Sequence, residues 1–132
     1  MKIVFIDNST IVLDTLKVLV AEIIDSMVID CQFFSDSNEV KKMIEDEVLE
    51  YDLLFLDTKL LDVTGYEIAI LAKKINKYKD KPIVAITTEY TQEAQEMGKR
   101  IGIQGWLVKS IVEDNLQSSL CEIIENIYAE VH

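Results

Sequence analysis

A short apolar run that ends in an aspartate constrains the fold of this chain more than any other stretch of its sequence. The run extends from Leu53 to Leu56, and Asp57 follows it directly. An uninterrupted apolar segment of this length is typical of a strand buried on both faces of a parallel sheet. Ligands of open α/β sheets bind outside the carboxyl ends of the strands. Asp57 is therefore predicted to lie at the rim of the sheet, where a carboxylate can take part in chemistry.

Apolar runs of strand length alternate with longer helical patterns along the rest of the chain. Five such pairs can be counted, which indicates βα units around a parallel sheet. The strands are expected near residues 2–7, 28–34, 53–57, 82–87 and 106–108. The helices are expected to begin near residues 11, 35, 64, 91 and 110.

Two capping boxes mark the starts of the third and fifth helices. Thr64 precedes Glu67 by three residues, and Ser110 precedes Glu113 in the same way, which is the spacing of a capping box. Gly65 is expected to let the chain turn into the third helix.

The fourth helix, near residues 91–101, has few apolar residues to hold it on the sheet. Its candidate anchors are Ala94, Met97 and Ile101. Thin anchoring lowers the free energy of local motion, so this helix is predicted to be the element most able to shift.

Length and charge narrow the functional class. A chain of 132 residues suits a single domain, expected over residues 1–132. With 24 acidic and 13 basic residues the net charge is −11, which disfavours direct nucleic-acid binding because such proteins need a basic face. The N-terminus lacks a signal-peptide pattern, and charged residues interrupt the apolar segment 11–31. We expect a cytoplasmic protein that does not bind membranes.

The cysteines and the single histidine exclude several kinds of site. Cys31 and Cys121 lie far apart and do not have metal-ligand spacing, so buried thiols in a reducing compartment are the simpler interpretation. The only histidine is His132. Catalytic triads, histidine metal sites and histidine phosphotransfer donors are thereby excluded within this chain.

Polar residues of complementary kinds stand at four predicted strand ends: Asp7 with Asn8, Asp57, Thr87 and Lys109. In a parallel sheet these ends share one edge. No glycine-rich phosphate loop accompanies them, which argues against P-loop enzymes, Rossmann dehydrogenases and flavodoxins. A small hydrolase is disfavoured because no base stands beside a nucleophile. The set suits phosphoryl transfer onto a carboxylate, with Mg²⁺, a lysine and a hydroxyl supplying compensating interactions.

The chain resembles the receiver domain of two-component response regulators over essentially its whole length. The matching segments are residues 6–8, Leu56-Asp57 with Gly65 eight positions after Asp57, residues 82–88 and residues 105–109. The resemblance implies an α/β fold: a five-stranded parallel sheet of order 2-1-3-4-5 in a doubly wound, flavodoxin/CheY-like (βα)5 sandwich.

The resemblance also assigns roles to individual residues. Asp57 matches the phosphoacceptor, which receives its phosphoryl group from a kinase histidine. Asp7 and Asn8 match the pair that holds Mg²⁺ together with Asp57 and the backbone carbonyl of Lys59. Lys109 matches the phosphate-binding lysine.

Further positions match the family's conformational switch. Thr87 matches the switch hydroxyl and Trp106 the switch aromatic, which together alter the face built from the fourth helix, fifth strand and fifth helix. Lys59, Thr88 and Glu89 occupy positions that tune the lifetime of the phosphoryl group.

The chain departs from the family pattern at four positions. Asn8 replaces an acidic ligand and brings no charge, which predicts weaker Mg²⁺ binding. Leu61 stands where a proline is common, and Thr88 stands where a small residue is usual and could slow transfer. Ser110 replaces a proline whose peptide bond is commonly cis, a conformation that would cost about 3 kcal/mol before serine.

Two functions follow as expectations. The first is a signalling module, not an enzyme, that assists its own phosphorylation and dephosphorylation. Its expected partners are a sensor histidine kinase or phosphotransfer protein, a downstream protein target and, in a homodimer, a second copy of itself. The second is a pseudo-receiver, the same fold used for phosphorylation-independent protein interaction or dimerisation. Asn8 is the feature that keeps this alternative open.

Overall fold

Five parallel strands form one sheet in the order β2-β1-β3-β4-β5, which confirms the predicted α/β fold and its strand order. The computed structural model describes residues 1–24, 27–109 and 113–131. The strands are β1 (Lys2–Ile6), β2 (Asp30–Phe34), β3 (Leu53–Leu56), β4 (Ile83–Thr87) and β5 (Gly105–Val108).

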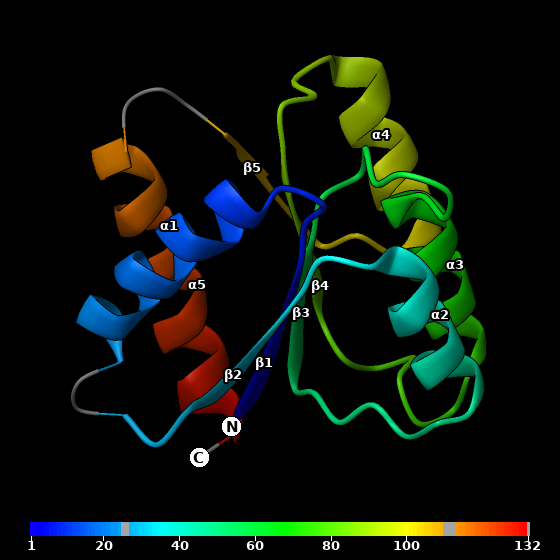
Figure 1. Cartoon of the computed structure of the whole chain (residues 1–132), viewed down its shortest axis with the longest axis horizontal. Helices are drawn as coiled ribbons and strands as arrows, with labels where there is room; N and C mark the ends of the chain where they lie inside the picture. Colours follow the sequence, from blue (N-terminus) through cyan, green and yellow to red (C-terminus); the bar gives the residue numbers. More distant parts are fainter. Residues whose placement is uncertain (25–26, 110–112, 132) are drawn as a thin grey trace.

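Helices cover both faces of this sheet (Figure 1). They are α1 (Thr10–Ile23), α2 (Ser37–Glu45), α3 (Gly65–Lys74), α4 (Gln92–Ile101) and α5 (Glu113–Val131). Helices α1 and α5 lie on one face, and α2, α3 and α4 lie on the other. Each face has its own hydrophobic core. Within the described ranges, no helix is long and apolar enough to cross a membrane.

The burial of the strands explains why the sequence shows continuous apolar runs. Every residue of β3 and β4 is buried, as is all of β1 after its first residue. The edge strands β2 and β5 have no fully buried residue. A strand covered on both faces needs apolar side chains at every position, so the three central strands give the clearest sequence signal.

The register of the central strands brings their carboxyl ends together. Ile6 pairs with Leu56 in the sheet, and the amide of Asp57 donates to the carbonyl of Ile6 at 3.1 Å. On the other side, the amide of Lys109 donates to the carbonyl of Thr87 at 2.8 Å. The residues that follow these strands are therefore held at one edge by the backbone itself.

The predicted cap of the third helix is present, and further helices are capped by side chains. Thr64 is the N-cap of α3, and its hydroxyl accepts a hydrogen bond from the amide of Glu67. Asp36 caps α2 and Thr91 caps α4 in the same way. The predicted capping role of Ser110 and the conformation of its peptide bond lie outside the described residues.

Gly65 has a different role from the expected turn. It is the first residue of α3, and the left-handed backbone of the preceding loop is at Asp62, whose φ is 65°. A Cβ on Gly65 would lie 2.2 Å from the carbonyl oxygen of Asp57 and 2.8 Å from the Cα of Thr58. The glycine is needed because helix α3 begins in direct contact with the backbone that carries these two residues.

The anchoring of α4 is thin, although one predicted anchor is wrong. Ala94 and Gly98 are the buried residues of this helix, and Ile101 packs partly against the core. Met97 is 37% exposed and does not anchor the helix. The next residue, Gly98, is buried instead, and the ring of Trp106 lies against it.

Candidate functional site

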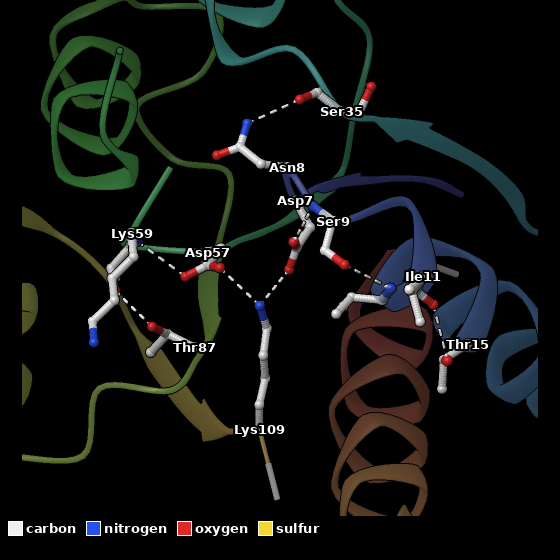
Figure 2. A network of polar contacts seen from close by, with 12 residues as sticks. Asp7, Asn8, Ser9, Ile11, Thr15, Ser35, Asp57, Lys59, Thr87 and Lys109 are labelled. Carbon is white, nitrogen blue, oxygen red and sulfur yellow. Dashed lines mark hydrogen bonds and ion pairs between the residues drawn. The ribbon is translucent and has the colours of Figure 1, made fainter. Parts of the chain in front are cut away.

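Two carboxylates and one ammonium group meet at the carboxyl edge of the sheet (Figure 2). The Nζ atom of Lys109 lies 2.5 Å from Oδ2 of Asp7 and 2.7 Å from Oδ2 of Asp57. We call these three residues the acidic–lysine cluster. Their side chains are 5% (Asp7), 12% (Asp57) and 18% (Lys109) exposed. The low exposure of all three side chains makes the interaction between their charges stronger than it would be in water.

The backbone fixes the second oxygen of each carboxylate. Oδ1 of Asp7 accepts from the amide of Ser9 at 2.9 Å, and Oδ1 of Asp57 accepts from the amide of Lys59 at 3.0 Å. Each carboxylate thus has one oxygen on a backbone N–H and the other on the ammonium. The two acids are held in defined orientations, with a net charge of about −1 over the cluster.

The environment keeps Lys109 protonated. Burial acts to lower the pKa of this lysine, but its hydrogen bonds to Asp57 and Asp7 and the charges of both carboxylates outweigh burial. The pKa of Lys109 therefore lies above its ordinary value. The cluster offers a permanent positive charge beside Asp57.

The amide of Asn8 is directed away from the acidic–lysine cluster (Figure 2). Its Nδ2 donates to the carbonyl of Ser35 at 3.0 Å, and its Oδ1 accepts from the amide of Leu61 at 2.5 Å. Asn8 thereby joins the loop before α2 to the loop before α3. The structure does not bring this predicted metal ligand together with Asp7 and Asp57.

The remaining residues still fit a hard divalent cation. Mg²⁺ in phosphoryl-transfer sites is typically held by one or two carboxylates, phosphate oxygens and several waters, and Asp7 and Asp57 supply two carboxylates. Among the described residues, no group of three or more acidic, cysteine or histidine side chains is placed to hold a metal ion. The site suits a cation that is completed by water and phosphate, not an all-protein cage.

A second group of polar side chains lies beside the first. The hydroxyls of Thr58 and Thr87 are 2.8 Å apart, and the Thr58 hydroxyl donates to Oε1 of Glu89 at 2.6 Å. The hydroxyl of Tyr66 donates to the same Oε1 at 3.2 Å. We call these four residues the hydroxyl cluster. Thr58 and Thr87 are 2% and 0% exposed, so water does not satisfy their hydroxyls.

Sequence reasoning missed Thr58 and Tyr66. Thr58 follows the predicted acceptor directly, and the reversal of side-chain direction along an extended chain could have suggested that it points away from Asp57. Tyr66 lies at the start of α3, and nothing in its sequence context indicates a contact with Glu89.

Trp106 lies between the hydroxyl cluster and α4. Its Nε1 donates to the backbone carbonyl of Glu89 at 2.8 Å, and its ring lies against Gly98. Thr88 and Lys59 are exposed. Within the described part of the chain, Lys59 makes no ion pair with Glu89; the carboxylate accepts from Thr58 and Tyr66 instead.

Comparison with known families gives a match over most of the chain. The family model described as response regulator receiver domain matches residues 3–121. Among curated proteins, stress response regulator protein 1 of Candida dubliniensis is 32% identical over 68 residues. This match covers 52% of the chain and 23% of that protein, so the chain spans about a quarter of the relative's length.

Solved structures share the fold at low sequence identity. The chemotaxis protein CheY4 of Vibrio cholerae is 24% identical with a TM-score of 0.74, covering 90% of this chain and 94% of that one. The receiver domain of sensor histidine kinase PA1611 of Pseudomonas aeruginosa PAO1 is 16% identical with a TM-score of 0.78, covering 97% of both chains. The latter structure has a magnesium ion coordinated in its active-site cleft.

Proposed function

The chain belongs to the response regulator receiver family, and from this premise we propose that it accepts a phosphoryl group on Asp57. The observation that carries the proposal is the acidic–lysine cluster, in which an ammonium contacts Asp57 and Asp7 at one edge of the sheet. The donor is a histidine of a sensor kinase or of a phosphotransfer protein. A downstream protein then binds the phosphorylated form.

The chain's own residues provide most of what this transfer needs. A carboxylate oxygen of Asp57 attacks phosphorus, the P–N bond of the phosphohistidine breaks, and the histidine leaves with its electron pair. Lys109 offsets the negative charge that two anions bring together. The amide of Lys59 holds one oxygen of Asp57, which fixes the orientation of the nucleophile.

Asp7, Asp57 and the backbone carbonyl of Lys59 would hold Mg²⁺. When bound, the ion supplies positive charge to the phosphoryl oxygens. Asn8 was predicted as a further ligand, but its amide oxygen already accepts from Leu61. We therefore propose weak Mg²⁺ binding in this chain, because the second position of the pair contributes neither charge nor a free oxygen.

Thr87 and Trp106 form the proposed switch. In the phosphorylated protein, the hydroxyl of Thr87 donates to the phosphoryl group and Trp106 changes its packing against α4. The face formed by α4, β5 and α5 then binds the target protein or a second copy of the chain. Thr88 and Lys59, exposed beside the site, and Glu89 would set how long the phosphoryl group survives.

A pseudo-receiver is the second candidate, and the contacts of two residues favour it. Lys109 already contacts both carboxylates, so the acidic–lysine cluster is stabilised without a divalent cation. Asn8 is engaged in joining two loops. In this case the same surface binds partners without phosphorylation.

Labelling with a small phosphoryl donor distinguishes the two functions. The protein is incubated with Mg²⁺ and acetyl phosphate, and intact mass detects a phosphoryl adduct. Asp57→Ala should abolish the adduct, while Asp14→Ala, which removes a carboxylate exposed on α1, should leave it unchanged. A folded wild-type protein that gains no adduct, beside a known receiver that does, would support the pseudo-receiver.

A further inference from the structure

The hydrogen bonds of the hydroxyl cluster have only one consistent set of directions. A carboxylate only accepts, so Thr58 gives its single hydroxyl proton to Glu89. The proton between Thr58 and Thr87 must then come from Thr87. The Thr87 oxygen in turn accepts from the amide of Glu89 at 3.2 Å. Thr87 is therefore fully engaged, as both donor and acceptor, before any phosphoryl group is present.

Glu89 links the hydroxyl of Thr87 to the ring of Trp106, the aromatic residue of the proposed switch. Its side chain accepts from Thr58, its backbone amide donates to Thr87, and its backbone carbonyl accepts from Trp106. The ring of Trp106 in turn lies against Gly98 of α4. One residue thus contacts both the Thr87 hydroxyl and the Trp106 ring, which are the two parts of the proposed switch.

We propose that Thr58 and Glu89 are positioning residues that hold the Thr87 hydroxyl away from Asp57 and oppose the phosphorylated conformation. The inference rests on the proposed function, because it concerns the step that follows phosphorylation. For Thr87 to donate to a phosphoryl group it must withdraw its proton from Thr58, which leaves a buried oxygen short of a partner. Burial of both threonines makes that loss costly.

Removal of the Thr58 hydroxyl should therefore favour the phosphorylated conformation. Thr58→Val keeps the shape of the side chain and leaves Thr87 free to turn toward Asp57. One net hydrogen bond corresponds to about a threefold to tenfold change in an equilibrium constant. Thr58→Ser keeps the hydroxyl and should behave as the wild type.

Fluorescence of Trp106, the one tryptophan of the chain, reports this equilibrium. Beryllium fluoride with Mg²⁺ serves as the phosphoryl mimic, and its apparent dissociation constant is read from the emission change. Thr58→Val should bind it about threefold to tenfold more tightly than the wild type. The matched control is Thr15→Val, which removes a hydroxyl that donates to a carbonyl within α1 and should leave the constant unchanged. Equal constants for Thr58→Val and the wild type would overturn the proposal.

A second variant and a second readout keep the test decisive. Glu89→Gln weakens the acceptor of the same chain of bonds, so it should shift the constant in the same direction; the double variant should shift it by less than the product of the single effects. If Thr58→Val does not fold, an unchanged constant in Glu89→Gln overturns the proposal.

Quenching of Trp106 by acrylamide, without mimic or metal, separates this inference from the proposed function. Thr58→Val should raise the quenching constant because the segment that holds the indole is released. If the wild type neither labels nor binds the mimic, the proposed function fails. If, in addition, Thr58→Val has the same quenching constant as the wild type, the positioning role of Thr58 is overturned as well.

Discussion

The acidic–lysine cluster and the hydroxyl cluster lie side by side but stabilise the site by different physics. In the first, an ammonium is shared by two carboxylates, so its strength depends on charge and on the local dielectric. In the second, hydroxyls form a chain that ends on one carboxylate, so its strength depends on whether each proton finds an acceptor. Asp57 and Thr58 are consecutive residues that each belong to one cluster. The proposed chemistry and the proposed conformational response thus meet at a single peptide bond.

Removal of Lys109 should cause the largest loss of stability, because it leaves two poorly exposed carboxylates without their cation. The hydroxyl cluster is left intact. In Lys109→Met two poorly exposed carboxylates lose their cation, and we expect a loss of about 2–4 kcal/mol in the free energy of unfolding. Mg²⁺ should then raise the melting temperature of the variant more than that of the wild type, since the ion replaces the missing charge. Thermal unfolding with and without Mg²⁺ measures both effects.

Lys81→Met is the matched control for Lys109→Met. Lys81 pairs with Asp52 across side chains that are 42% and 26% exposed, so its loss should cost less than about 1 kcal/mol. Equal losses in the two variants would show that the acidic–lysine cluster behaves as an ordinary surface ion pair.

Gly65→Ala should disturb both clusters at once and rank second. The new Cβ would meet backbone atoms of Asp57 and Thr58, which cannot move without displacing both side chains. We expect a loss of about 1–3 kcal/mol in the free energy of unfolding, together with slower labelling of Asp57 by acetyl phosphate. Chemical denaturation and intact mass measure the two changes.

Gly105→Ala is the control for Gly65→Ala, because it makes the same substitution away from the site. Its Cβ would lie 3.1 Å from a side-chain atom of Val84, and a side chain yields more easily than backbone. A Gly105→Ala variant that loses as much stability and labelling as Gly65→Ala would argue against a specific contact between α3 and the site.

Loss of the Asn8 side chain should have a smaller effect, confined to the loops beside the acidic–lysine cluster. Asn8→Ala removes the bonds to Ser35 and Leu61 and should cost about 1–2 kcal/mol by chemical denaturation. Asn8→Asp keeps an acceptor for Leu61, adds a charge near Asp7 and should tighten Mg²⁺ binding. Asn38→Ala, which removes an exposed bond to Asp62, should leave stability and Mg²⁺ affinity nearly unchanged. Unchanged Mg²⁺ affinity in Asn8→Asp would contradict the proposed cause of weak binding.

The acidic–lysine cluster could be predicted from the sequence and the hydroxyl cluster only in part. Asp57 and Lys109 each follow a strand, and the parallel register carries both to one edge of the sheet. The alternation of strands and helices predicts that shared edge, and the family resemblance supplies the strand order that brings the two residues together. Asn8 stands at the position where the family usually has an acidic metal ligand. Its side chain nevertheless faces the neighbouring loops, because it bonds to the backbone of Ser35 and Leu61. Thr58 and Tyr66 meet Glu89 only through tertiary packing, which no periodicity encodes. Met97 was wrongly predicted to anchor α4, because the sequence does not show that the buried positions of this helix are Ala94 and Gly98.

Gly98→Ala should have the smallest effect on stability and should act on the hydroxyl cluster alone. The new methyl group would lie 2.7 Å from Cζ3 of Trp106, so the ring must shift, while alanine favours the helix by up to about 1 kcal/mol. These effects oppose each other, and we expect the free energy of unfolding to change by less than about 1 kcal/mol.

The emission of Trp106 in Gly98→Ala should change because the indole moves relative to the Glu89 carbonyl. Labelling of Asp57 should stay near the wild-type rate, because a shift of the ring changes neither the bond from Lys109 to Asp57 nor the bond from the Lys59 amide to Asp57. Lys99→Ala, an exposed change in the same helix, should alter neither property. If Gly98→Ala slows labelling as much as Gly65→Ala does, the two clusters act as one unit, and the distinction between charge and hydroxyl bonding fails.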